Sequence, residues 1–162
     1  MDDRALVAQQ LGRPPRAFLR VARRCPFGRP AVTEQAPFDD EDAPFPTTYY
    51  LTCRRLVTAV ARIEAAGGVE RWTDAVRRDE TLAASRARAD AEQRRLRREL
   101  AGGREHPSLD LGIGGSGRDG SLKCLHAHAA FALARPGYEL GERILAEVEP
   151  LWPPERCCSE RE

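Results

Sequence analysis

The stretch "TTYYLTC" at residues 47–53, followed at once by "RRLVTAVARIEAAGG" at residues 54–68, decides the fold class of this chain. The first segment is rich in β-branched and aromatic residues, which favour strands. In the second segment, apolar residues recur at the spacing of one helical face, and two glycines provide a helix end. We therefore predict a strand that closes at Cys53 and leads directly into a helix.

The segments before this junction predict two further strands and a short helix. "AFLRVARRC" at residues 17–25 and "AVTEQ" at residues 31–35 are separated by "PFGRP", which contains both turn-forming residue types. Residues 3–11 predict a short helix, which the following "GRPP" stops. Because the three strands follow one another closely, we expect a small antiparallel sheet in the N-terminal third of the chain.

The rest of the chain predicts helices and one long glycine-rich connection, "AGGREHPSLDLGIGGSGRDG", at residues 101–120. The expected helices cover, in order, residues 69–79, 80–100, 121–134 and 138–152. An early antiparallel sheet with helices packed on one face is an α+β fold. The sequence therefore predicts the α+β class.

The composition is typical of a folded domain without a membrane span. The balance of 41% hydrophobic and 31% charged residues is that of a globular chain, and no apolar run approaches the length needed to cross a bilayer. We expect one domain over residues 1–152 and a polar, disordered tail at residues 153–162. The N-terminal sequence lacks the pattern of a signal peptide, so we expect a cytoplasmic protein with reduced cysteines.

The segment "KCLHAH", which begins at Lys123, groups the most reactive side chains of the chain. If its helix begins near Ser121, Cys124 lies in the first turn, where the helix dipole favours a thiolate. His128 then lies on the same face as Cys124, and His126 points elsewhere. This pattern predicts a catalytic set with Cys124 as nucleophile, His128 as its base and Lys123 as an anion partner.

Cys53 stands at a second junction between a strand and a helix. If both helices begin on the same side of the sheet, Cys53, Cys124 and His128 converge and suit a zinc ion, with Cys25, Cys157 or a water as a fourth ligand. The spacing contains no C-x-x-C or H-E-x-x-H motif. The alternative is that Cys53 is a small buried apolar residue and His128 a partly buried helix residue.

The glycine loop "GIGGSG" at residues 112–117 formally matches G-x-G-x-x-G. No convincing strand leads into it and its helix begins several residues later, so a dinucleotide site is not expected. Two interpretations stay open. The loop is a flexible connector, or its backbone N–H groups lie close to a bound anion.

A second functional hypothesis is an interaction module without chemistry. The arginine-rich helix at 80–100 and the acidic loop at 39–42 would then contact another protein or a polyanion such as RNA or polyphosphate. The net charge of +1 provides no overall field for nucleic acid or an anionic membrane. Charge reversal would test this surface at four arginines: Arg94, Arg95, Arg97 and Arg98.

Two motifs carry a resemblance to a known family. "PFPTTYYLTC" at residues 44–53 and "KCLHAHAA" at residues 123–130, with the "LGRPPRAFLRVARRC" opening, resemble the bacterial family catalogued as domain of unknown function 501. The resemblance implies a small, cytoplasmic, largely actinobacterial protein and brings no catalytic residues with it. This chain departs from the expected family pattern at "RPGYELG", residues 135–141, after the histidine-bearing helix.

Overall fold

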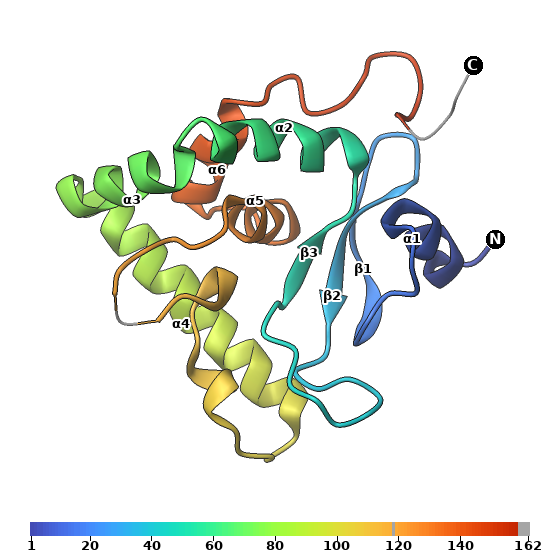
Figure 1. Cartoon of the computed structure of the whole chain (residues 1–162), viewed down its shortest axis with the longest axis horizontal. Coiled ribbons are helices and arrows are strands. Elements are labelled where there is room, and N and C mark those ends of the chain that lie inside the picture. Colours follow the sequence, from blue (N-terminus) through green and yellow to red (C-terminus); the bar gives the residue numbers. More distant parts are fainter. Residues whose placement is uncertain (118, 159–162) are drawn as a thin grey trace.

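The computed structural model describes residues 1–117 and 119–158 and has an α+β architecture (Figure 1), as predicted. Its sheet consists of β1 (Phe18–Arg24), β2 (Pro30–Gln35) and β3 (Tyr49–Leu51), in the order β1-β2-β3, with both pairs antiparallel. The small antiparallel sheet in the N-terminal third is thus confirmed.

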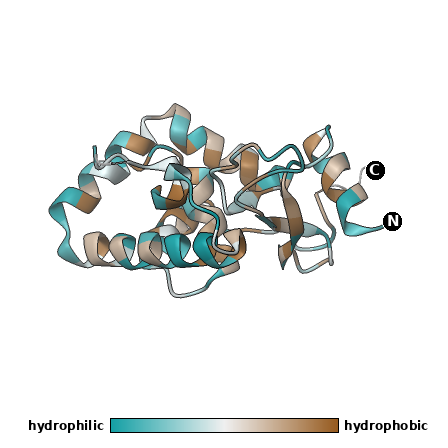
Figure 2. Cartoon of the chain, turned by 90° about the horizontal axis from the view of Figure 1, so that it is seen from below, coloured by the Kyte–Doolittle hydropathy of each residue, from teal (hydrophilic) through white to brown (hydrophobic). Residues whose placement is uncertain are grey.

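The described residues form six α-helices. Their bounds are α1 (Asp3–Leu11), α2 (Arg54–Ala65), α3 (Gly68–Arg78), α4 (Glu80–Ala101), α5 (Leu125–Ala134) and α6 (Glu139–Ala146), and two short 3₁₀ helices cover Pro107–Asp110 and Ile113–Gly115. Along the outer helices hydrophilic and hydrophobic residues alternate (Figure 2), as expected of helices with one buried face. Among the described residues, no helix combines the length and apolar character that a membrane crossing requires.

The central strand is covered on both faces. All six residues of β2 are buried, including the polar Thr33, Glu34 and Gln35. Figure 1 shows α1 on one side of the sheet and α5 with the remaining helices on the other. The sequence predicts helices on one face of the sheet only, and the structure places a further helix, α1, on the opposite face.

α5 is the central helix of the core. Eight of its ten residues are buried, so it has no polar face. Phe131 of α5 stacks edge-on against Tyr49 of β3, with 5.5 Å between ring centroids, and against Tyr138, with 5.6 Å. A helix that is buried on nearly every side is stabilised by packing within the core rather than by propensity alone.

Two helix boundaries differ from the prediction. The helix expected from Ser121 begins at Leu125, with Cys124 as an extended N-cap residue and Lys123 at a φ of 64°. The last helix ends at Ala146 instead of continuing to residue 152. Proline at position 150 disfavours helical backbone at the residue before it, which is consistent with this early end.

The polar segment after the domain follows the body of the protein where it is described. Residues 153–158 contain no helix or strand, yet Cys157 is buried. Residues 159–162 of the predicted tail lie outside the described part of the chain. The expected division at residue 152 stays a prediction.

A close helix contact gives a stability test. A Cβ atom at Gly141 of α6 would lie 2.6 Å from the Ala132 Cβ and 2.6 Å from the His128 carbonyl oxygen, both in α5. Gly141→Ala should therefore lower the free energy of unfolding by about 2 kcal/mol, measured by urea denaturation. Gly117→Ala is the matched control, since a Cβ there meets no atom within 4 Å. Equal effects of the two changes would contradict this packing.

Candidate functional site

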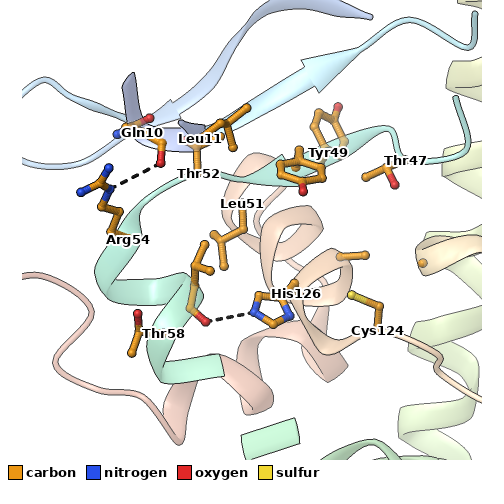
Figure 3. A pocket seen from close by; sticks show the side chains of 14 residues that line it. Gln10, Leu11, Thr47, Tyr49, Leu51, Thr52, Arg54, Thr58, Cys124 and His126 are labelled. Atoms are coloured by element: carbon orange, nitrogen blue, oxygen red, sulfur yellow. Dashed lines mark hydrogen bonds between the residues drawn. The ribbon is translucent and has the colours of Figure 1, made fainter. Parts of the chain in front are cut away.

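A pocket of about 530 Å³ lies between α2, β3 and the start of α5. Apolar side chains line part of its wall, and hydroxyl groups and Arg54 line another part. Figure 3 shows Gln10, Thr52 and Arg54 grouped at one end and Cys124 with His126 at the other. The volume is in the range of sites for small organic molecules.

At the second end, three potential metal ligands converge. One ligand atom each from Glu64, Cys124 and His126 lies within 4.8 Å of the other two. Glu64 comes from the last turn of α2, Cys124 is the N-cap residue of α5, and His126 lies in the first turn of α5. The packing of α2 against the start of α5 therefore assembles a Glu/Cys/His group that could hold a metal ion.

The imidazole of His126 is fixed by one hydrogen bond and one ion pair. Its Nε2 lies 3.0 Å from the carbonyl oxygen of Val57, to which it donates (Figure 3), and its Nδ1 lies 3.1 Å from Oε1 of Glu64. In Figure 3 the sulfur of Cys124 lies on the side of the His126 ring opposite the dashed hydrogen bond. Both Cys124 and Glu64 therefore approach the Nδ1 side of the ring.

The Glu64 carboxylate is held by its second oxygen. Oε2 accepts a hydrogen bond of 2.7 Å from the backbone N–H of Leu125, the first residue of α5. That N–H has no acceptor within its own helix, so Glu64 caps α5 from α2. Oε1 is left facing His126 and Cys124.

This environment changes the protonation of His126. Contact with the Cys124 sulfur raises the pKa of His126 to about 9, with smaller contributions from the Val57 carbonyl and the Glu64 carboxylate, against the opposing effect of burial. These contacts favour the protonated form of the ring in the metal-free protein. Binding a metal ion at Nδ1 requires the loss of that proton.

Cys124 meets a different histidine from the one predicted. The sequence pairs Cys124 with His128 through helical spacing, whereas the structure brings Cys124 beside His126. The reason is the later start of α5. Cys124 has extended backbone angles, φ −143° and ψ 113°, so the rule that residues four apart share a helix face does not apply to it.

His128 is sealed in the core. It has no exposed surface, its Nδ1 lies 2.6 Å from the Tyr138 hydroxyl and its Nε2 lies 3.1 Å from the carbonyl oxygen of Leu122. Burial lowers the pKa of His128 to about 4. A neutral imidazole with both nitrogens occupied holds Leu122 and Tyr138 in place, and in the described residues it belongs to no metal-ligand group.

Cys53 also lies apart from that group. Its thiol is buried at the N-terminus of α2, with its sulfur 3.8 Å from the sulfur of Cys158. Burial raises the pKa of Cys53 to about 11. No group of three ligand atoms within the described residues contains Cys53, Cys25 or Cys157.

Lys123 is at the protein surface. Its Nζ forms an ion pair of 2.7 Å with Asp119 four residues before it, and this contact lowers the pKa of the Asp119 carboxyl group. The positive φ of Lys123 turns the chain just before the N-cap of α5. The structure thus gives Lys123 an acidic partner of its own.

The residue that sequence analysis missed is Glu64. It lies 61 positions before Leu125, in no recognised motif, and a glutamate near the end of an amphipathic helix normally faces solvent. The available signal was negative. Cys124, the N-cap residue of α5, is of a type that caps poorly and its side chain forms no capping hydrogen bond, so an N–H at the start of α5 needs an acceptor from elsewhere. Nothing in the sequence pattern identifies Glu64 as that acceptor.

The glycine loop is occupied by internal contacts. The N–H of Ile113 donates to the Asp90 carboxylate at 2.9 Å, and Gly112 N–H donates to the carbonyl oxygen of Ser116 at 3.0 Å. A Cβ at Gly114, where φ is 74°, would lie 3.1 Å from the Leu122 carbonyl oxygen. The glycine at 114 therefore allows the loop to pass close to the strand-like segment before Cys124.

The arginines of α4 are also engaged internally. Arg86 donates to the carbonyl oxygens of Gly120 and Ser121, and Arg94 donates to that of Asp110. Arg95 pairs with Glu99, and Arg97 is fully buried. Arg86 and Arg94 of the predicted basic stripe thus hold parts of the long connection against α4.

Comparison with known proteins adds a family. A family model described as "Protein of unknown function (DUF501)" matches residues 21–146, a span that includes Glu64, Cys124 and His126. No curated protein and no solved structure matches the chain. The resemblance expected from the "PFPTTYYLTC" and "KCLHAHAA" motifs is confirmed, and the chain belongs to the DUF501 family.

Proposed function

We propose that the protein binds one zinc ion through Glu64, Cys124 and His126, with a further coordination position open to the adjacent pocket. The observation that carries this proposal is the convergence of three ligand atoms within 4.8 Å of one another. A carboxylate, a thiolate and an imidazole are a donor set that zinc accepts.

The surroundings of these residues support the same proposal. Ligating histidines commonly donate their second ring N–H to a backbone carbonyl, and His126 does so to Val57 at 3.0 Å. The non-ligating oxygen of Glu64 is likewise held, by the Leu125 N–H at 2.7 Å. These contacts orient both groups before any ion arrives.

The geometry does not build a catalytic triad from Cys124, His126 and Glu64. In a catalytic triad the nucleophile and the orienting carboxylate use opposite ring nitrogens. Here Nε2 donates to the Val57 carbonyl and Nδ1 lies beside Glu64. The Cys124 sulfur lies on the side of the ring opposite the dashed hydrogen bond (Figure 3). The ring therefore does not connect Cys124 to Glu64 as a relay.

Three protein ligands beside a pocket of about 530 Å³ is the arrangement of catalytic rather than structural zinc sites. When bound, such an ion polarises a substrate oxygen or lowers the pKa of a bound water. The cationic Arg54 at the far end of the pocket favours a small molecule that carries an anionic group.

Metal analysis of the purified, reduced protein tests this proposal. We expect one zinc ion per chain in the wild type and in Cys53→Ser, and none in Cys124→Ser, because only Cys124 belongs to the ligand group. Zinc lost from Cys53→Ser but kept by Cys124→Ser would overturn the assignment. A metal-free wild type in which Cys124 alone is alkylated rapidly would support a nucleophile instead.

Cobalt substitution tests the open position. The absorption spectrum of the cobalt-loaded protein should show thiolate charge transfer and should shift when azide is added, since azide can occupy an open position. A spectrum that is unchanged by azide would indicate a closed, structural site.

A further inference from the structure

The C-terminal segment after α6 is fastened to α2. Figure 1 shows residues 147–158, here called the C-terminal strap, passing along α2 and ending near the turn between β1 and β2. Arg55 of α2 donates from Nε to the carbonyl oxygen of Leu151 at 3.2 Å and from Nη2 to that of Pro150 at 2.9 Å. Leu151 and Trp152 pack against the core.

The strap ends in two neighbouring cysteines that contact two different cysteines of the body. The sulfur of Cys158 lies 3.8 Å from that of Cys53, the N-cap residue of α2. The thiol of Cys157 is hydrogen-bonded to that of Cys25, which directly follows β1. The strap and the body of the protein, more than 100 residues apart in sequence, thus form two thiol pairs, Cys53 with Cys158 and Cys25 with Cys157.

We propose that Cys53 and Cys158 form a reversible disulfide that fastens the C-terminal strap to the first turn of α2. A sulfur–sulfur separation of 3.8 Å leaves less than 2 Å to the bonding distance of about 2.05 Å, and the strap has no helix or strand at Cys158 to resist the movement. This inference is independent of the zinc proposal.

Accessibility gives the order of events. Cys158 is exposed, whereas Cys53, Cys25 and Cys157 are buried. Burial raises the pKa of both Cys53 and Cys25, so these thiols are poor first nucleophiles at neutral pH. Cys158 is therefore the thiol that a dissolved disulfide meets, and the buried pair Cys25 and Cys157 stays reduced longer.

The oxidant is a low-molecular-weight disulfide such as oxidised glutathione. The Cys158 thiolate attacks one of its sulfurs and releases one glutathione thiolate, leaving a mixed disulfide on Cys158. The Cys53 thiolate then attacks the Cys158 sulfur and releases the second glutathione. The two protein thiols lose two electrons and two protons, and the disulfide reagent becomes two glutathione thiols.

The arrangement favours a disulfide over a metal cluster of the four thiols. No three of Cys25, Cys53, Cys157 and Cys158 form a group with all sulfurs within 4.8 Å among the described residues. The sulfurs are separated into two pairs, which suits pairwise bonds.

The test uses the full chain with Cys124→Ser, so that the remaining thiols are these four. After incubation with oxidised glutathione, we expect one intramolecular disulfide between Cys53 and Cys158 by mass spectrometry. The bond closes a loop of more than 100 residues, so the midpoint of thermal unfolding should rise by roughly 10 °C and return on reduction.

The vicinal pair supplies matched controls. Cys157→Ser in the same background should keep the bond and the stabilisation, whereas Cys158→Ser should lose both. A bond between Cys157 and Cys158, a disulfide of Cys53 that survives in Cys158→Ser, or disulfide-linked dimers would overturn the proposal. Zinc bound by these four thiols in the Cys124→Ser protein would also overturn it.

Discussion

His128→Ala lowers the free energy of unfolding by about 4 kcal/mol, whereas His126→Ala leaves the fold in place and reduces zinc affinity by more than about 100-fold. The two histidines are two residues apart in "KCLHAH". They lie in opposite environments, since His126 faces the pocket and His128 has no exposed surface. Their substitutions should therefore separate function from stability.

The effect at His128 has two causes. Removing a fully buried ring leaves a cavity among tightly packed residues of α5 and α6. It also leaves the Tyr138 hydroxyl and the Leu122 carbonyl without the hydrogen bonds that they now form with the ring, at 2.6 Å and 3.1 Å. Unfolding in urea measures the loss, and Gly117→Ala serves as a neutral reference.

The effect at His126 comes from the lost ligand. Its side chain contributes one hydrogen bond to Val57 and one ion pair to Glu64, so the cost to stability should stay near 1 kcal/mol. Zinc affinity, measured by competition with a chromophoric chelator, should fall far more in His126→Ala than in a variant of a residue that is not a zinc ligand. Zinc retained by His126→Ala and lost by a fully folded His128 variant would restore the ligand set predicted from spacing.

How far the sequence predicts this site depends on whether the helix begins before or after Cys124. The cysteine and the adjacent histidines could be recognised because they lie together in six residues. Their partnership could not, because it depends on whether Cys124 is inside the helix or caps it. The segment before α5 is extended at Cys124, and Lys123 has a positive φ. This segment packs closely against Gly114 of the glycine loop, a tertiary contact that the local sequence does not reveal.

Contacts between distant segments were the other limit. The sheet could be predicted because strand propensity and the turn sequence are local properties. Glu64 and the thiol partners of Cys157 and Cys158 could not, since each depends on how α2 lies against α5 and the strap. Arg55, which binds the strap through two carbonyl oxygens, resembles any exposed helix arginine in the sequence.

Arg97→Glu should unfold the protein or lower its free energy of unfolding by about 4 kcal/mol or more. Arg97 is fully buried in α4, and its Nη1 donates to the Phe45 carbonyl oxygen at 2.9 Å, with Nη2 donating to that of Ser108 at 3.4 Å. Burial already lowers the pKa of this guanidinium. A carboxylate in its place would be buried against two carbonyl oxygens, with charge repulsion and no donor.

Arg95→Glu is the matched change on the same helix. Arg95 is exposed and pairs with Glu92 and Glu99, so its reversal should cost no more than about 1 kcal/mol by urea denaturation. If the two reversals prove equally mild, Arg97 is not the buried anchor of residues Phe45 and Ser108. A large difference between the two variants means that reversing all four arginines, Arg97 included, would destroy the fold. A test of polyanion binding by α4 therefore has to reverse exposed arginines such as Arg95 and leave Arg97 unchanged.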